Sequence, residues 1–246
     1  MNILFLLYGI IIGSFLNVCI LRIPLNESIT FDRSHCPKCG YVLKWYDLIP
    51  LLSYIILRGK CRSCQTKISS QYPIIELLNG AAYLGIYLYL GLSWQTLIAC
   101  FLFSALLVVF MIDLRYKIIP NGLVLFILLL GVIQTFLTRD YLSHIIGFFI
   151  VSGILILLSL MVKNGMGMGD IKLMAAAGLL LGWDQILLAL MIGAILGSVI
   201  GISLIVIKVI KPREAIPFGP FLATGIMTAM LFGEPIINWY IGLVFR

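Results

Sequence analysis

Long apolar runs dominate the chain, and short polar or charged segments separate them. Runs of about 17 to 25 apolar residues are long enough to cross a bilayer as helices. The pattern predicts about eight such spans, covering approximately Ile3–Leu21, Pro73–Leu92, Trp94–Ile112, Ile119–Leu137, Tyr141–Val162, Ile171–Leu181, Gln185–Ile207 and Phe218–Phe232. The sixth is short, which suggests that the glycine-rich loop before it dips into the membrane under a protein cover. The predicted fold class is an all-α polytopic membrane protein.

Composition supports the same class of protein. Of 246 residues, 62% are hydrophobic and only 11% are charged, a balance that soluble domains of this size do not carry. The first apolar run has no basic segment before it and no small-residue cleavage site after it, so we interpret it as a retained helix rather than a signal peptide. The basic residues lie in loops without a groove-reading motif, which argues against nucleic-acid binding.

The distribution of positive charge predicts the orientation. The chain has 17 Lys and Arg residues against 10 Asp and Glu, a net charge of +7. If the loop over residues 22–72 is cytoplasmic and the spans alternate, every cation except Arg139 and Arg246 falls on the cytoplasmic side. Cytoplasmic loops concentrate Lys and Arg, so we expect this orientation in a bacterial cell (inner) membrane, with both termini on the opposite side.

A glycine-rich loop followed by an apolar helix places one carboxyl group at a special position. In Asn164–Gly178, glycines alternate with other residues up to Asp170, and the following segment is almost wholly apolar. Glycines permit close backbone approach, so Gly167 and Gly169 are predicted to support the site around Asp170. An acid at the edge of a hydrophobic slab is a functional candidate, because desolvation disfavours its charged form.

Asp113 is the second candidate acid, since it ends an apolar run on the same predicted face as Asp170. Two neighbouring carboxyl groups cannot both ionise easily, so one can act as general acid while the other activates a water. This arrangement hydrolyses a peptide bond without a covalent intermediate. Two alternatives remain open: an interfacial ion pair of Asp113 with Arg115, and a proton relay in a transporter, which would favour acids deep within the spans.

Two Cys-x-x-Cys pairs occur in the long polar loop, at Cys36 and Cys39 and at Cys61 and Cys64. Four cysteines in this pattern predict a zinc-ribbon-like site, although the gap between the pairs is slightly longer than usual. Such a zinc ion would be structural, because four thiolates leave no open coordination position. Disulfides or redox pairs are the alternative, which a reducing cytoplasm disfavours. His35 is expected to be a bystander.

These segments together resemble the type IV prepilin peptidases. The resemblance rests on Gly-x-Gly-Asp ending at Asp170, on DLRYKIIPN at 113–121, on GSFLNVCILRIP at 13–24, on the cysteine pairs and on YPIIELL at 72–78 and IPFGPFLATG at 216–225. It extends nearly end to end. It implies that Asp113 and Asp170 are the catalytic aspartates of an enzyme that cuts a short basic leader from prepilin-like proteins.

The resemblance also implies a second activity, N-methylation of the new N-terminal residue with S-adenosylmethionine. Residues 1–92 would then form the methyltransferase part and residues 93–246 the peptidase bundle. Gly59 and Glu76 are candidate methyl-transfer residues. Each also has a purely structural interpretation: Gly59 could only form the turn at the second cysteine pair, and Glu76 could only pair with a nearby cation. A peptidase without methyltransferase activity and a non-enzymatic assembly factor remain as alternative functions.

Overall fold

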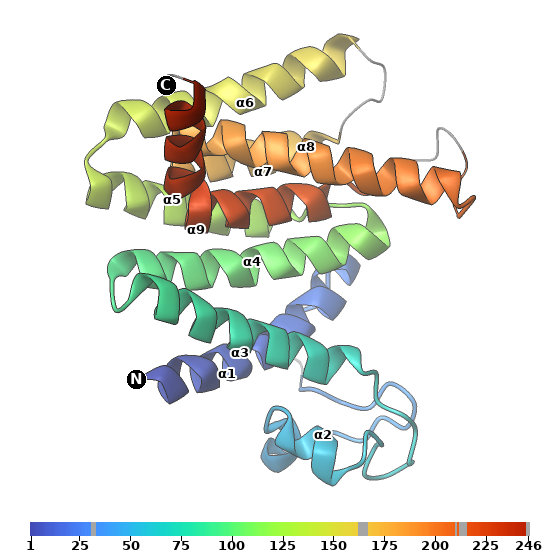
Figure 1. Ribbon diagram of the computed structural model, residues 1–246. Helices are drawn as coiled ribbons and strands as arrows, with labels where there is room; N and C mark the ends of the chain where they lie inside the picture. Colours follow the sequence, from blue (N-terminus) through green and yellow to red (C-terminus); the bar gives the residue numbers. More distant parts are fainter. Residues whose placement is uncertain (31–32, 162–166, 210, 212–215, 245–246) are drawn as a thin grey trace. The chain divides into compact units, whose positions relative to one another are not determined.

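The computed structural model describes the whole chain except residues 31–32, 162–166, 210, 212–215 and 245–246. Its described part consists of helices and loops, with two isolated β-bridges in the cysteine loop. The helices are α1 (Asn2–Arg22), η1 (Ile23–Leu25), η2 (Trp45–Leu48), α2 (Leu52–Ile56), α3 (Gln71–Leu90), α4 (Trp94–Tyr116), α5 (Asn121–Thr138), α6 (Tyr141–Met161), α7 (Met168–Leu181), α8 (Trp183–Val206) and α9 (Gly219–Val244) (Figure 1).

The all-α membrane fold is confirmed, with one change in the number of spans. Within the described residues, seven helices are long and apolar enough to cross a membrane, one fewer than expected. The exception is α7, whose 14 residues are too few to span the hydrocarbon core. Most residues of α7 are buried against its neighbours, as suits a short helix that is surrounded by protein.

The chain forms two compact units, Met1–Ser104 and Ala105–Arg246, and the division falls inside α4. In the first unit, α1 and α3 pack closely where α1 carries glycine. A Cβ on Gly9 would lie 2.8 Å from the carbonyl oxygen of Asn79, and one on Gly13 would lie 2.7 Å from the Cα of Glu76. The Asn79 side chain donates a 2.7 Å hydrogen bond to the Gly9 carbonyl. Small residues and an interhelical hydrogen bond thus hold this pair together.

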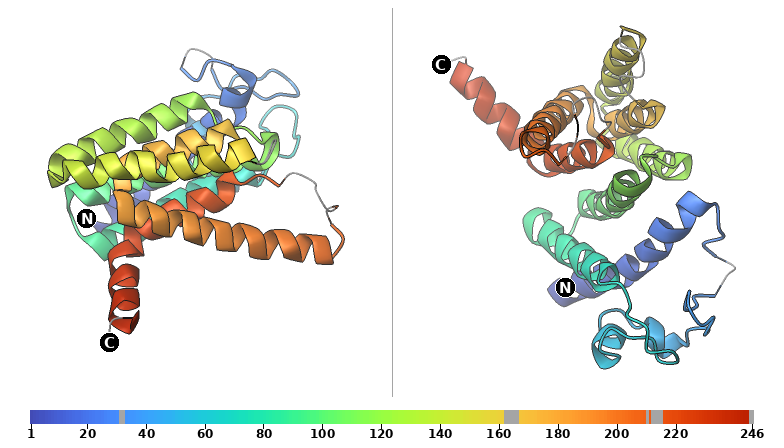
Figure 2. Two further views of the ribbon diagram at one scale, coloured as in Figure 1. Left: turned by 90° about the horizontal axis from the view of Figure 1, so that it is seen from above. Right: turned by 90° about the vertical axis from the view of Figure 1, so that its right-hand side faces the viewer.

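In the second unit, α7 packs against α5 and α6, and α8 packs against α9. Figure 2 shows α6 and α7 side by side. A Cβ on Gly147 of α6 would overlap the carbonyl oxygen of Gly178 in α7, so the two backbones touch there. A Cβ on Gly131 of α5 would lie 3.0 Å from the backbone nitrogen of Leu180. Glycine therefore permits the close approach that buries α7.

The last helix differs most from its predicted bounds. The sequence predicts a span that ends at Phe232, but α9 continues to Val244 with Pro235 inside it. A proline removes one helical hydrogen bond and kinks the helix, and the C-terminal part of α9 runs at an angle to its first part (Figure 1). The acid and proline at 234–235 interrupt the apolar pattern without ending the helix.

Candidate functional site

Asp113 lies near the C-terminal end of α4, inside the second unit, and is only 5% exposed. The backbone N–H of Gly219, the first residue of α9, donates a 2.9 Å hydrogen bond to its Oδ2. Helix N-termini favour anions, because their first N–H groups have no partner within the helix. A Cβ on Gly219 would lie 2.7 Å from the same oxygen. Gly219 therefore contributes a donor and the space that lets the donor approach.

Asp170 lies in the first turn of α7 and is 9% exposed. The backbone of Gly167, which caps this helix, hydrogen-bonds the Asp170 carboxyl group. A Cβ on Gly167 would lie 3.0 Å from Asp170 Oδ2, and one on Gly169 would lie 3.0 Å from the Cβ of Ile119. Both glycines that the sequence singled out are thus in close contact with their surroundings. The preceding residues of the motif, 164–166, lie outside the described residues.

Asp113 and Asp170 belong to the same compact unit, and their carboxyl groups are close enough to repel each other electrostatically. Each comes from a helix end: the last turns of α4 for Asp113 and the first turn of α7 for Asp170. Two carboxyl groups buried in one place can hold one proton between them, because both cannot easily carry a charge there. Such a pair contains one acid and one base at the same place.

The four cysteines of the loop converge in the first unit. Their sulfur atoms all lie within 4.8 Å of one another, with Cys36 Sγ 3.8 Å from Cys64 Sγ and Cys39 Sγ 4.0 Å from Cys61 Sγ. All four are free thiols, so the disulfide alternative is not what the structure shows. Zinc–thiolate bonds of about 2.3 Å in a tetrahedron separate the sulfurs by about 3.8 Å, so the cluster fits a four-thiolate zinc site.

Each cysteine pair sits on a similar turn. The N–H of Cys36 donates to the carbonyl of Tyr41, and that of Cys61 donates to the carbonyl of Thr66. A residue with positive φ follows each pair, Gly40 at 69° and Gln65 at 56°. Hydrogen bonding with the Thr66 side chain lowers the pKa of the Cys64 thiol to about 6, which favours the thiolate that binds metal. His35 is outside the cluster, as expected.

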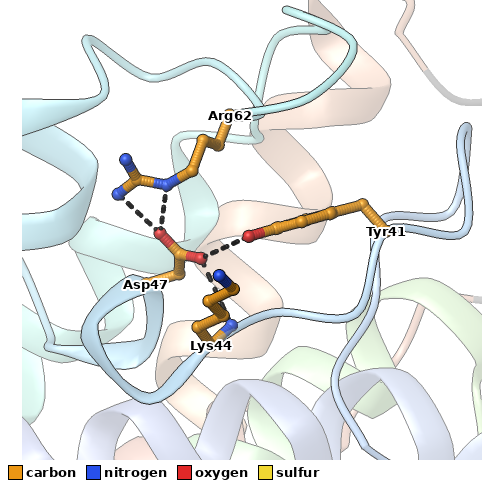
Figure 3. A network of polar contacts seen from close by, with 4 residues as sticks. All are labelled: Tyr41, Lys44, Asp47 and Arg62. Atoms are coloured by element: carbon orange, nitrogen blue, oxygen red, sulfur yellow. Dashed lines mark hydrogen bonds and ion pairs between the residues drawn. The ribbon is translucent and has the colours of Figure 1, made fainter.

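An ion pair that the sequence did not reveal connects the second cysteine turn to the segment between the pairs (Figure 3). Arg62, which lies between Cys61 and Cys64, contacts Asp47 Oδ1 through Nε and Nη2, each at 2.8 Å. The other oxygen of Asp47 accepts hydrogen bonds from the Lys44 N–H at 3.2 Å and the Tyr41 hydroxyl at 3.4 Å. Asp47 therefore connects the second cysteine turn, through Arg62, to residues 41–44, which follow the first cysteine pair.

Gly59 and Glu76 both have visible structural contacts in the first unit. Gly59 has φ of +66°, and its carbonyl accepts from the Ile68 N–H at 2.8 Å, so it turns the chain into the second cysteine pair. Glu76 is 6% exposed and accepts a 2.8 Å hydrogen bond from the N–H of Leu51. The Ser14 side chain of α1 also hydrogen-bonds Glu76. These contacts give both residues a structural role in the first unit.

These features define an α-helical membrane protein with a four-cysteine cluster in one compact unit and a buried carboxyl pair in the other. Comparison with known proteins identifies the family of this chain. Residues 7–90 match the bacterial peptidase A24 N-terminal domain, and residues 100–202 match the type IV leader peptidase family. The chain belongs to the type IV prepilin leader peptidase/N-methyltransferase family, and the resemblance inferred from the sequence is confirmed.

Curated relatives match over nearly the whole chain. The prepilin leader peptidase/N-methyltransferase of Aeromonas salmonicida (strain A449) is 33% identical over 273 residues, covering 97% of this chain and 93% of the relative. The protein of the same name from Bacillus subtilis (strain 168) is 33% identical over 245 residues, covering 98% of each chain. The Legionella pneumophila protein of that name is 34% identical over 266 residues, covering 96% of this chain and 93% of the relative. No solved structure matches the chain.

Proposed function

We propose that this chain cleaves the short basic leader from prepilin-like proteins and then N-methylates the new N-terminal residue. The observation that carries the proposal is the burial of Asp113 and Asp170 in the same compact unit, where a glycine backbone hydrogen-bonds each carboxyl group and the charge of Asp113 acts on Asp170. Family membership and relatives named for both activities support it. The distribution of Lys and Arg supports a cytoplasm-facing site in the cell (inner) membrane.

The carboxyl pair can perform both proton transfers of peptide hydrolysis. The ionised carboxyl group takes a proton from water as the water oxygen attacks the scissile carbonyl carbon. The protonated partner then gives its proton to the amide nitrogen as the C–N bond breaks. The N–H of Gly219 and the backbone of Gly167 hold the two side chains in place during these steps. One proton remains shared by the pair after each cycle, so the site is ready for the next leader.

Residues 1–92 would form the methyltransferase part, and residues 93–246 the peptidase bundle. The four thiols fit a structural zinc ion, which when bound would close the loop between α1 and α3. S-adenosylmethionine would supply the methyl group. Gly59 and Glu76 remain the candidate residues for this activity, and both lie in the first unit beside or within the cysteine loop.

The test uses the purified full chain, a prepilin substrate and S-adenosylmethionine. The Asp113→Asn and Asp170→Asn variants should each lose leader cleavage, because neither carboxamide can exchange a proton with water or the amide. Asp140→Asn is the matched control: Asp140 is exposed and caps the Ser143 N–H, which asparagine can also do, so cleavage should persist.

Mass spectrometry of the product reports the second activity separately. A mature pilin heavier by one methyl group only when S-adenosylmethionine is present supports the bifunctional proposal. A cleaved but unmethylated product would reduce it to a leader peptidase. Cleavage by both Asp→Asn variants at the wild-type rate would overturn the assignment of the carboxyl pair.

A further inference from the structure

The cysteine loop carries an exposed apolar patch that neither proposed activity uses. The patch consists of Trp45, Leu48, Leu52, Ile55 and Ile56, from η2 and α2. Trp45 is 77% exposed, Ile55 69% and Ile56 72%. The two helices contact each other, and exposed apolar side chains that are grouped together mark a surface that binds a partner or a membrane.

The position of the patch along α3 indicates that its partner is the lipid bilayer. Leu51, the residue before α2, donates its N–H to Glu76 in the second turn of α3, which is a candidate membrane span from Gln71. With a rise of 1.5 Å per residue, that contact lies about 7 Å inside the span. The polar interface on each side of a bilayer is about 5–8 Å thick. The start of α2 therefore lies beside the first turns of α3, at the level where this candidate span enters the bilayer, and not beyond its end.

The charge around the patch fits the same partner. Lys44, Arg58 and Lys60 flank it in the sequence and are exposed. Lys44 lies 5.8 Å from the ring centre of Tyr46, so cationic and aromatic groups occur together. The acid of this segment, Asp47, is held by Arg62. Tryptophan with apolar side chains and a cationic rim is the composition that binds at the interface of anionic lipid bilayers.

We propose that the apolar patch inserts into the headgroup–acyl boundary of the bilayer, so that the cysteine loop lies against the membrane surface instead of standing free in the cytoplasm. Leu51 and Glu76 fix its depth, and the cations contact anionic headgroups. The inference requires only that α1 and α3 cross the membrane, and it is independent of the proposed catalytic roles.

Tryptophan fluorescence of the full-length protein tests this. The chain has four tryptophans, and Trp94, Trp183 and Trp239 are all exposed, so their replacement by phenylalanine leaves Trp45 as the single reporter. The variant is placed in nanodiscs of phosphatidylcholine and phosphatidylglycerol, without substrate. Brominated acyl chains should quench Trp45 emission several-fold more than unbrominated ones, and iodide in the water should quench it little. Strong iodide quenching without bromolipid quenching would overturn the proposal by placing the patch in water. Protection from both quenchers would also overturn it, because protein would then cover the patch.

A paired substitution supplies the control. In the single-tryptophan background, Ile55→Glu with Ile56→Glu should abolish bromolipid quenching and make Trp45 accessible to iodide. Thr30→Glu adds a negative charge at an exposed position of the same loop, outside the patch and the cysteine turns, and it should change neither. Unchanged metal content shows that the loop remains folded in each variant. Bromolipid quenching that survives the double substitution would contradict the role of the patch.

Discussion

Replacing Gly219 with alanine tests how the carboxyl site is held. The new Cβ would lie 2.7 Å from Asp113 Oδ2 and 3.0 Å from its Cγ. Carbon and oxygen atoms do not pack this closely, so the carboxyl group or the start of α9 must move by roughly 0.7 Å or more. The 2.9 Å hydrogen bond from the Gly219 N–H would be lengthened at the same time. The site would lose both its spacing and one of its donors.

The expected cost follows from these two effects. A misplacement of about 1 Å in a catalytic group lowers the rate by about 100-fold. We therefore expect kcat/KM for leader cleavage to fall by about 10- to 100-fold, or about 1.4–2.7 kcal/mol in transition-state stabilisation. Methylation of a pilin that is already cleaved should not change, because the proposed methyltransferase residues lie in the other compact unit.

Gly242→Ala is the matched control, since Gly242 lies in the same helix and a Cβ there would meet nothing within 4 Å. It should leave cleavage unchanged. Thermal unfolding of both variants separates a local effect from loss of fold. If Gly219→Ala cleaves prepilin at the wild-type rate, then Gly219 does not hold Asp113, and this account of the site is wrong.

Three further predictions concern the metal cluster and the helix packing. Asp47→Asn should weaken the hold on Arg62 and the second cysteine turn, so that zinc passes to a competing chelator several-fold faster; an unchanged transfer rate would show that the ion pair does not order the site. Chelation of the metal should make residues 33–69 sensitive to protease while leaving the α5–α7 packing intact, because the loop has little apolar core of its own; a resistant metal-free loop would contradict a structural role for zinc. Gly147→Ala should destabilise the protein by about 1–3 kcal/mol through overlap with the α7 backbone. Gly153→Ala in the same helix, with open space around it, is the control for the melting temperature.

The sequence predicts helices well here because membrane spans must be long and apolar to satisfy their backbone groups internally. The predicted helix ends differ from the observed ones where a polar residue or a proline lies inside a helix. The helix α4 runs on past the predicted end at Ile112 to Tyr116, so Asp113 lies within it, and α9 continues through Pro235. A polar residue interrupts an apolar run without interrupting the helical hydrogen bonds, so hydropathy alone places these ends too early.

Contacts between distant segments are the part that the pattern could not supply. The sequence predicts Asp113 and Asp170 on one face, but only the folded chain places both in one compact unit, with the charge of Asp113 acting on Asp170. Gly219 lies in the IPFGPFLATG segment that carries part of the resemblance, but a glycine before a proline looks like an ordinary helix start, so the sequence does not reveal its role. The sequence does not reveal the role of Asp47 either, because one acid in a polar loop has many possible partners. In each case the missing information is a partner more than ten residues away.

The carboxyl site depends on two glycines, which have no side chain, as well as on the two acids. Gly219 and Gly167 each place backbone against a carboxylate where any Cβ would lie within 3.0 Å of an oxygen. A backbone N–H is a donor that carries no net charge, so it can position a carboxyl group without neutralising it as an Arg or Lys would. In the proposed mechanism the pair must keep one shared proton to act as both acid and base, and a cation in contact with both groups would favour ionising them together. In that mechanism, glycine allows Asp113 and Asp170 to be held firmly while they still exchange a proton.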